Sequence, residues 1–158
     1  MGEVNQEKCD MIENYFAQYG WKYNRGDEMG VWHTGFRGDV ASFNITVRVT
    51  EWWIYFIVNP FVVGPKEQEL RNRLYPHLLR LNQDINVAKY CIDRDFDVVL
   101  TVELPCDTAA TFQYGEFEDA INLVCHYCDK YYLEVLKLAT EVGAPSSYLD
   151  EAGDVDIS

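Results

Sequence analysis

The sequence predicts one α+β domain in which three helices pack on an antiparallel sheet of about five strands. Apolar residues recur at helical spacing in three separate segments. Between these segments lie stretches typical of strands, joined by short turns. The chain has 158 residues, 48% of them hydrophobic, which suits one packed core. The predicted element order is α-β-β-β-α-β-β-α.

The first helix is predicted at residues 5–19, where Cys9, Ile12, Phe16 and Tyr19 are spaced three, four and three apart. Gly20 follows and is a residue that commonly ends helices. Three or four strands are predicted next, in the ranges 21–24, 31–36, 40–49 and 52–58. Asn59-Pro60 is expected to end this run of strands.

The second helix is expected to open at Pro65 and to contain a kink at Pro76. Its apolar stripe consists of Leu70, Leu74, Leu78, Leu81 and Ile85. Two strands at 87–92 and 98–104 follow, and a third helix is expected at about 116–140. The predicted domain therefore spans residues 1–142, and residues 143–158 are predicted to form an acidic, flexible tail.

Charge and composition exclude several classes of function. The formal net charge is −13, which repels the phosphates of nucleic acids, so no direct nucleic-acid binding is expected. The longest apolar run, 52–58, is too short to cross a membrane, and the first ten residues lack the apolar stretch of a signal peptide. Five mostly isolated cysteines are typical of a reducing compartment, which predicts a cytoplasmic protein.

The pair Cys125 and Cys128 in "LVCHYCDKYY" allows three interpretations: half a zinc site, a redox dithiol, or small apolar residues on a helix. A zinc site needs two further ligands, and no second Cys-x-x-Cys exists in the sequence. A redox thiol needs a helix N-terminus, whereas these cysteines fall within the third helix. Cys128 falls on the apolar stripe, so we expect packing, with no metal and no cofactor.

No set of residues with the pattern of a catalytic site stands out. Residues 93–97, "DRDFD", resemble the start of a calcium loop, but Val98 replaces the required Gly and Leu104 the required Glu. A charged hairpin turn is the favoured interpretation. His33 and His77 have no Ser/His/Asp or Cys/His pattern around them, so we predict no catalytic residues and no enzymatic activity.

The stretch "VASFNITVRVTEWWIYFIV" predicts an interaction surface. Its first half alternates, so that apolar residues line one face and Asn44, Thr46 and Arg48 line the other. Its second half does not alternate. If Thr50-Glu51 is the turn, Val49 pairs with Trp52, and the core face is lined by Trp52, Ile54, Phe56 and Val58.

This register leaves three large side chains, Trp53, Tyr55 and Ile57, on the outer face beside Arg48 and Thr46. A slip of one residue would exchange the two sets but still leave large apolar residues outside. A partner protein, a second copy of the chain, or the chain's own segment 60–64 would have to cover them.

The chain resembles the YbjN family of bacterial proteins, labelled "putative sensory transduction regulators". The matching stretches are "YFAQYGWKY", "HTGFRG", "LLRLNQDINVAKYCIDRDFDVVLTVELP" and "FEDAINLVCHYCDKYY". They lie within residues 5–140. The resemblance implies a fold like that of type III secretion chaperones, which are small, usually dimeric α+β proteins that hold other proteins.

The resemblance and the outer strip together predict a non-catalytic protein-binding or chaperone-like regulatory module that acts as a homodimer. The alternative is a small-ligand sensor with an apolar pocket between the sheet and the helices. The candidate partner or dimer surface consists of Trp53, Tyr55, Ile57, Arg48 and Thr46.

Overall fold

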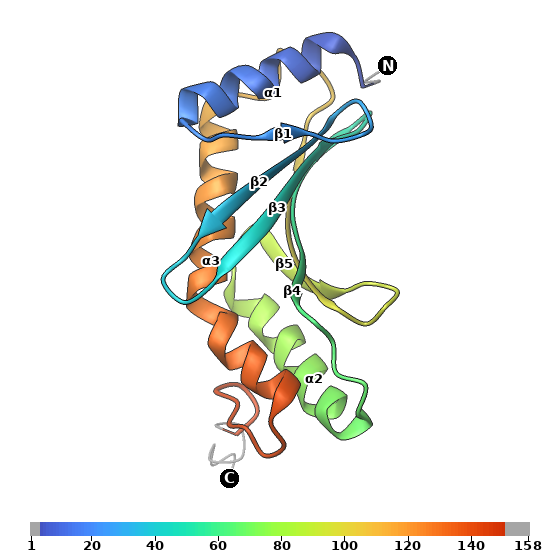
Figure 1. The fold of residues 1–158 in the computed structure, drawn as a ribbon, viewed down its shortest axis with the longest axis vertical. Helices are drawn as coiled ribbons and strands as arrows, with labels where there is room; N and C mark the ends of the chain where they lie inside the picture. The colour runs from blue at the N-terminus through green and yellow to red at the C-terminus, as the bar shows by residue number, and fades with distance from the viewer. Residues whose placement is uncertain (1–3, 151–158) are drawn as a thin grey trace.

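A computed structural model describes residues 4–150, which form helices and strands in the order α-β-β-β-β-α-β-β-α (Figure 1). The helices are α1 (Gln6–Tyr19), α2 (Gln68–Asp84) and α3 (Tyr114–Thr140). The strands are β1 (Asn24–Arg25), β2 (Val31–Arg37), β3 (Ser42–Val49), β4 (Trp53–Val62), β5 (Ala88–Ile92) and β6 (Val98–Pro105). The predicted α+β class is confirmed, with one more strand than the five expected.

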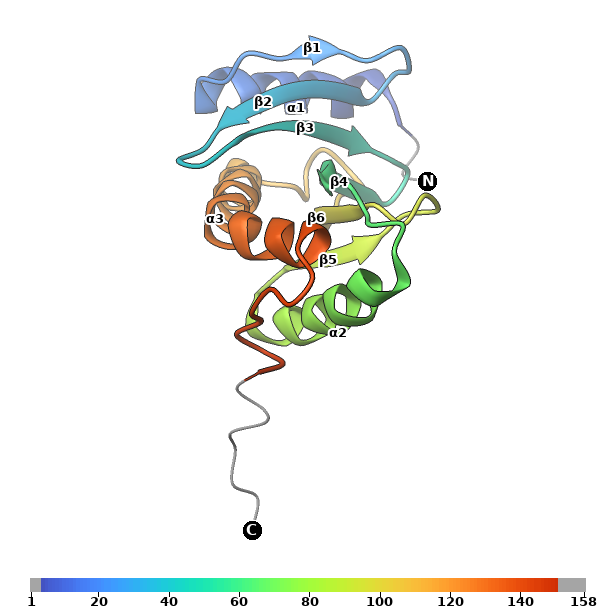
Figure 2. The same cartoon turned by 60° about the horizontal axis from the view of Figure 1, so that its bottom comes forward.

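All six strands of the described chain form one sheet in the order β1-β2-β3-β4-β6-β5, and every neighbouring pair is antiparallel. The sheet curves around α3, and the three helices lie on the same side of it (Figure 2). The opposite side of the sheet is therefore its outer face.

A single core lies between the sheet and the helices. Phe117 of α3 lies at its centre, with its ring 5.1 Å from that of Phe16 on α1 and 5.5 Å from that of Phe56 on β4. The predicted stripe of α2 is buried along its whole length. Because each helix has one apolar face, burial of these faces holds all three on one side of the sheet.

The first helix and its end agree with the prediction. Asn5 caps the N-terminus by accepting a hydrogen bond from the Lys8 N–H at 2.9 Å. Gly20 ends the helix with a φ of 86°, a left-handed conformation that glycine adopts without steric cost. The strand expected at 21–24 is wrong in extent, because pairing begins only at Asn24. The rings of Trp21 and Tyr23 instead pack on the core.

The connection between β3 and β4 differs from the expected hairpin. Val49 pairs with Ile54 rather than Trp52, so the register is shifted by two residues. A shift of two keeps each side chain on its face, so the division into core and outer residues holds for Ile54 and beyond. Trp52 is the exception, since it lies in the turn and is 50% exposed.

Two further boundaries were predicted wrongly. Asn59-Pro60, a cis peptide, does not end the sheet run, since β4 continues to Val62 after a change of register beyond Val58. Helix α2 begins at Gln68, three residues after Pro65. Pro65 is buried, and its carbonyl oxygen accepts a hydrogen bond from Arg71 Nε at 2.6 Å, which holds the chain before the helix. Pro76 lies inside α2 as expected.

Residues 143–150, the described part of the predicted tail, pack along α2 and on the C-terminal part of α3. Ala144 and Ser146 are buried, and Asp150 accepts hydrogen bonds from Arg73 of α2 at 3.0 and 3.1 Å. The boundary between domain and tail at residue 142 stays a prediction. The remainder of that tail, 151–158, lies outside the described residues.

Candidate protein-binding surface

The five residues of the predicted surface lie together on the outer face of β3 and β4. Thr46 pairs with Ile57, and Arg48 pairs with Tyr55. Trp53 continues the column on β4 and is 44% exposed, while Tyr55 and Ile57 are half-buried. Side chains two residues apart on one strand share a face, so the three large residues form a continuous apolar column.

Polar side chains border this column on both neighbouring strands. Thr46 and Arg48 flank it on β3, and Thr101 and Glu103 flank it on β6, where Glu103 pairs with Tyr55. An apolar centre with a polar border is the usual construction of a protein interface.

Arg48 covers part of the Tyr55 ring. Its guanidinium carbon lies 5.1 Å from the ring centroid, a cation–π arrangement across the strand pair. On the other side of Tyr55, Glu103 forms an ion pair with Lys89 of β5 at 3.1 Å. The column is therefore flanked by a positive group on β3 and by a paired charge on β6 and β5.

Segment 60–64 does not cover this face. Phe61 and Val62 are buried in the core on the helix side. The Phe61 ring lies 5.7 Å from that of Phe43 and 5.0 Å from that of Tyr90. One of the three predicted covers is thereby excluded.

Sequence reasoning missed the residue that holds the edge of this surface in place. Lys8 of α1 is only 1% exposed, and its Nζ donates to the carbonyl oxygens of Thr50, Glu51 and Cys106 at 3.2, 2.9 and 2.6 Å. It lies four residues before Ile12, on the apolar stripe of α1, and a lysine at that position was the available signal.

The turn itself is closed by hydrogen bonds. Thr50 N–H donates to the Trp53 carbonyl at 2.8 Å, and Cys106 N–H donates to the Trp52 carbonyl at 2.7 Å. These bonds and the Lys8 contacts join α1, the β3–β4 turn and the end of β6. The exposed indoles of Trp52 and Trp53 are thus presented from a firmly held turn.

The cysteines occupy the positions expected of packing residues. Cys128 is fully buried on the α3 stripe, and Cys125 is half-buried beside it, while His126 is exposed. Burial raises the pKa of Cys125 to about 12 and raises that of Cys128 as well. Thiols with such pKa values stay protonated at neutral pH and are poor nucleophiles.

Residues 93–97 form the expected turn between β5 and β6. Asp93 Oδ1 accepts hydrogen bonds from the N–H groups of Asp95 and Asp97 at 2.9 and 3.0 Å. Asp97 Oδ1 accepts from the Gly64 N–H at 2.8 Å. These carboxylates serve as turn acceptors, because they satisfy backbone donors in the loop.

His33 and His77 lie in different environments, one exposed and one buried. His33 is exposed on the outer face, where Nδ1 is 3.2 Å from Thr46 Oγ1. His77 is fully buried, with Nδ1 2.7 Å from Ser146 Oγ and Nε2 3.8 Å from a Glu134 carboxylate oxygen. Burial is the largest cause of the lowered pKa of His77.

Among the described residues, no group of three or more His, Cys, Asp or Glu side chains is placed to hold a metal ion. Likewise, none of the helices among residues 4–150 is long and apolar enough to cross a membrane.

The antiparallel sheet, with three helices on one side and an apolar column on the other, defines a small α+β protein with a type III secretion chaperone-like fold. Residues 8–137 match the model of the YbjN family, described as "Putative bacterial sensory transduction regulator". The chain belongs to this family. No curated protein matches it in sequence.

Solved structures with the same fold include YbjN from E. coli, at 12% identity and a TM-score of 0.55, covering 78% of this chain and 90% of that one. A chain of the heterodimeric ExoU–SpcU complex from the type III secretion system of Pseudomonas aeruginosa is 16% identical, with a TM-score of 0.54. That match covers 82% of this chain and 98% of the other. A chain of the ExsC–ExsE complex is 13% identical, with coverages of 84% and 96% and a TM-score of 0.52.

Proposed function

We propose that this protein is a non-catalytic, chaperone-like regulatory module that binds protein through the outer face of its sheet and acts as a cytoplasmic homodimer. The observation that carries the proposal is the column Trp53, Tyr55 and Ile57, which lies opposite the core with a polar border. Apolar side chains left in water forgo about 1.5–3 kcal/mol each relative to full burial, so a partner that covers them gains affinity.

The fold comparisons support a role in holding proteins. Two of the similar structures, ExoU–SpcU and ExsC–ExsE, are complexes between proteins. A symmetric dimer would place the same column of two chains face to face, which is the simplest way for one chain to cover its own apolar patch. Five cysteines without disulfides agree with a reducing cytoplasm.

A small-ligand sensor is the second candidate, because an apolar groove of about 500 Å³ lies between α3 and the sheet. A sensor pocket usually encloses most of its ligand. This groove has exposed residues at its mouth, among them Val87 and His126, and so fits a small apolar molecule less well.

The test is the double variant Tyr55→Glu with Ile57→Lys, which leaves net charge unchanged. We expect it to raise the dissociation constant of the dimer at least about tenfold, because two charges would then be buried in an apolar interface. Light scattering and sedimentation measure the oligomer, and circular dichroism checks the fold.

Ser42→Glu with Asn44→Lys is the matched control. Both residues are exposed on the same outer face of β3, two positions apart like the test pair. The control variant should keep the wild-type oligomeric state. Equal dissociation by both pairs, or a wild-type monomer that captures no protein through this face, would overturn the proposal.

A further inference from the structure

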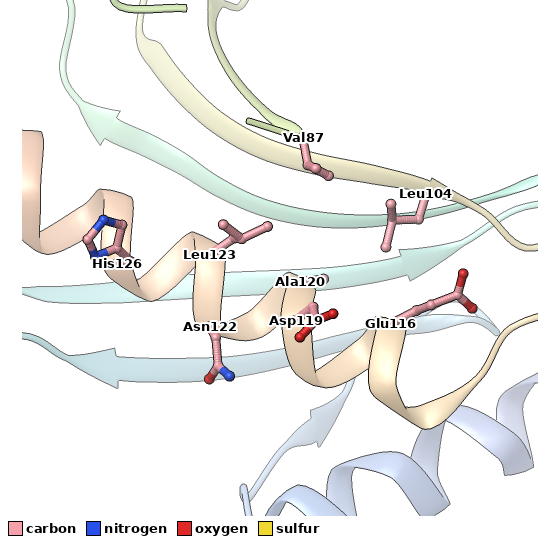
Figure 3. A pocket seen from close by; sticks show the side chains of 8 residues that line it. All are labelled: Val87, Leu104, Glu116, Asp119, Ala120, Asn122, Leu123 and His126. Atoms are coloured by element: carbon pink, nitrogen blue, oxygen red, sulfur yellow. The ribbon is translucent and has the colours of Figure 1, made fainter. Parts of the chain in front are cut away.

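A second apolar surface lies on the helix side of the sheet, beside α3. It is the groove of about 500 Å³, with Leu104 of β6, Ala120 and Leu123 of α3, and Val87 as its apolar lining (Figure 3). Glu116 and Asp119 of α3 lie along its rim. The groove is thus apolar at its base and acidic at its edge.

The groove exists because two paired strands end at different places. β5 begins at Ala88, opposite Val102, while β6 continues to Pro105, opposite Trp53 of β4. Residues 103–105 therefore have a strand neighbour on one side only. The layer between sheet and helix is open at this end, and the backbone of β6 forms a free edge there.

Val87 stands at this opening in an unusual conformation. Its φ is 66°, in the left-handed region that β-branched residues rarely adopt, and its side chain is 59% exposed. Local strain of this kind is concentrated at binding sites. Here it accompanies an apolar side chain held at the mouth of the groove.

Two carboxylates lie at the edge of the groove. Glu116 and Asp119 are both exposed, and the Glu116 carboxylate is fixed by the Gln113 N–H at 2.7 Å. Lys89, a cation on the neighbouring β5, is paired with Glu103. The chain as a whole carries a net charge of −13, so the surrounding field also favours cations.

We propose that this groove binds an extended peptide segment of a partner protein in which a short apolar stretch is flanked by Lys or Arg. The segment lies along residues 103–105 of β6 and continues the line of β5, which is strand addition at a free edge. Its apolar side chains contact Leu104, Ala120 and Leu123, and its cations face Glu116 and Asp119. The site is separate from the outer column, on the other side of the sheet.

The probe is a fluorescein-labelled peptide, Arg-Arg-Leu-Val-Leu-Arg-Arg, titrated with the full chain and followed by fluorescence anisotropy. Two control peptides replace the arginines by glutamate or the three apolar residues by serine. We expect binding of the first peptide alone, weakening as salt is raised, because the rim charges are exposed to solvent.

Variants of the protein locate the site. Asp119→Lys should weaken peptide binding at least about fivefold. Glu118→Lys makes the same charge change on an exposed α3 residue that does not line the groove, so its effect on peptide binding should be smaller. Val87→Gly removes the apolar side chain and suits the left-handed backbone. The Val87→Gly variant should bind the peptide more weakly than wild type, and its melting temperature should equal or exceed that of wild type.

Several results would overturn the proposal. Equal binding of the serine peptide would indicate charge attraction alone, and equal effects of Asp119→Lys and Glu118→Lys would place the site elsewhere. If the groove bound uncharged dodecanol equally well in wild type and Asp119→Lys, and bound no peptide, its occupant would be a small apolar ligand. If Val87→Gly lost the dimer, the occupant would be a second copy of the chain. The variant Tyr55→Glu with Ile57→Lys should still bind the peptide, so the two proposals fail independently.

Discussion

The ammonium nitrogen of Lys8 lies 2.6 Å from the carbonyl oxygen of Cys106, across 98 positions of the sequence. The same nitrogen also donates to the carbonyls of Thr50 and Glu51. A buried charge is tolerated only when hydrogen bonds replace the water it has lost, and these three acceptors do so. One side chain thus ties α1 to the turn that carries Trp52 and Trp53.

Lys8→Met should therefore destabilise the fold. Methionine keeps the apolar stem but leaves the carbonyl groups without their donor, at a cost of about 2–3 kcal/mol in the free energy of unfolding. For a domain of this size the melting temperature should fall by roughly 4–12 °C. Calorimetry measures the change, and Lys22→Met, at an exposed lysine, is the control. A Lys8→Met protein that melts like wild type would show that these bonds contribute nothing.

His77 should make stability fall at acidic pH. Burial first, and then Arg73, lower its folded pKa below that of the unfolded chain, although Glu134 opposes them. The unfolded state then takes up the proton more readily, so the stability is fully present above the unfolded pKa of about 6.5. It is lost as the pH falls from there through the folded pKa.

Urea unfolding at several pH values between 8 and 5 tests this expectation. His77→Gln cannot titrate, so its free energy of unfolding should fall less steeply below about pH 6.5 than that of wild type. The exposed His33→Gln should follow the wild-type curve. Parallel curves for His77→Gln and wild type would contradict a lowered pKa. Tyr148 and Ser146, which contact the ring, are uncharged in this range and should not add a slope.

Cys125 and Cys128 should be replaceable by alanine together. Only two sulfur atoms are lost, and the resulting small cavity should cost about 1–2 kcal/mol in the free energy of unfolding without loss of the fold. Denaturant unfolding gives the cost, and metal analysis of the purified wild-type protein should find no stoichiometric zinc. One zinc per chain, released in the double variant, would show that the thiols are ligands.

Millimolar calcium should leave the melting temperature unchanged. The Asp93 and Asp97 carboxylates already accept hydrogen bonds from the backbone, and the Gly and Glu of a calcium loop are missing. A cation bound only to the folded state would raise the melting temperature. A calcium-dependent rise, absent with magnesium and in Asp93→Asn, is the result that would refute a purely structural turn.

The sequence by itself determined the elements whose signals are local. The stripes of α1, α2 and α3 and the alternation of β3 are readable because a helix or strand repeats its buried side every 3.6 or two residues. The alternation of β3, carried across the predicted pairing, placed Trp53, Tyr55 and Ile57 on the outer face even though the pairing was shifted by two. Face depends on odd or even position alone, so it survives such a shift.

Only the tertiary structure decided the rest, because contacts between distant segments outweigh local preference. The Cys106 N–H and the Lys8 ammonium hold the turn that moves Trp52 out of the core and pairs Val49 with Ile54. Phe61 carries β4 past a proline because its ring is buried among those of Phe43 and Tyr90. The groove beside α3 depends on where β5 starts relative to β6. These outcomes rest on packing and hydrogen bonds across tens of residues, and no periodicity in a local window encodes them.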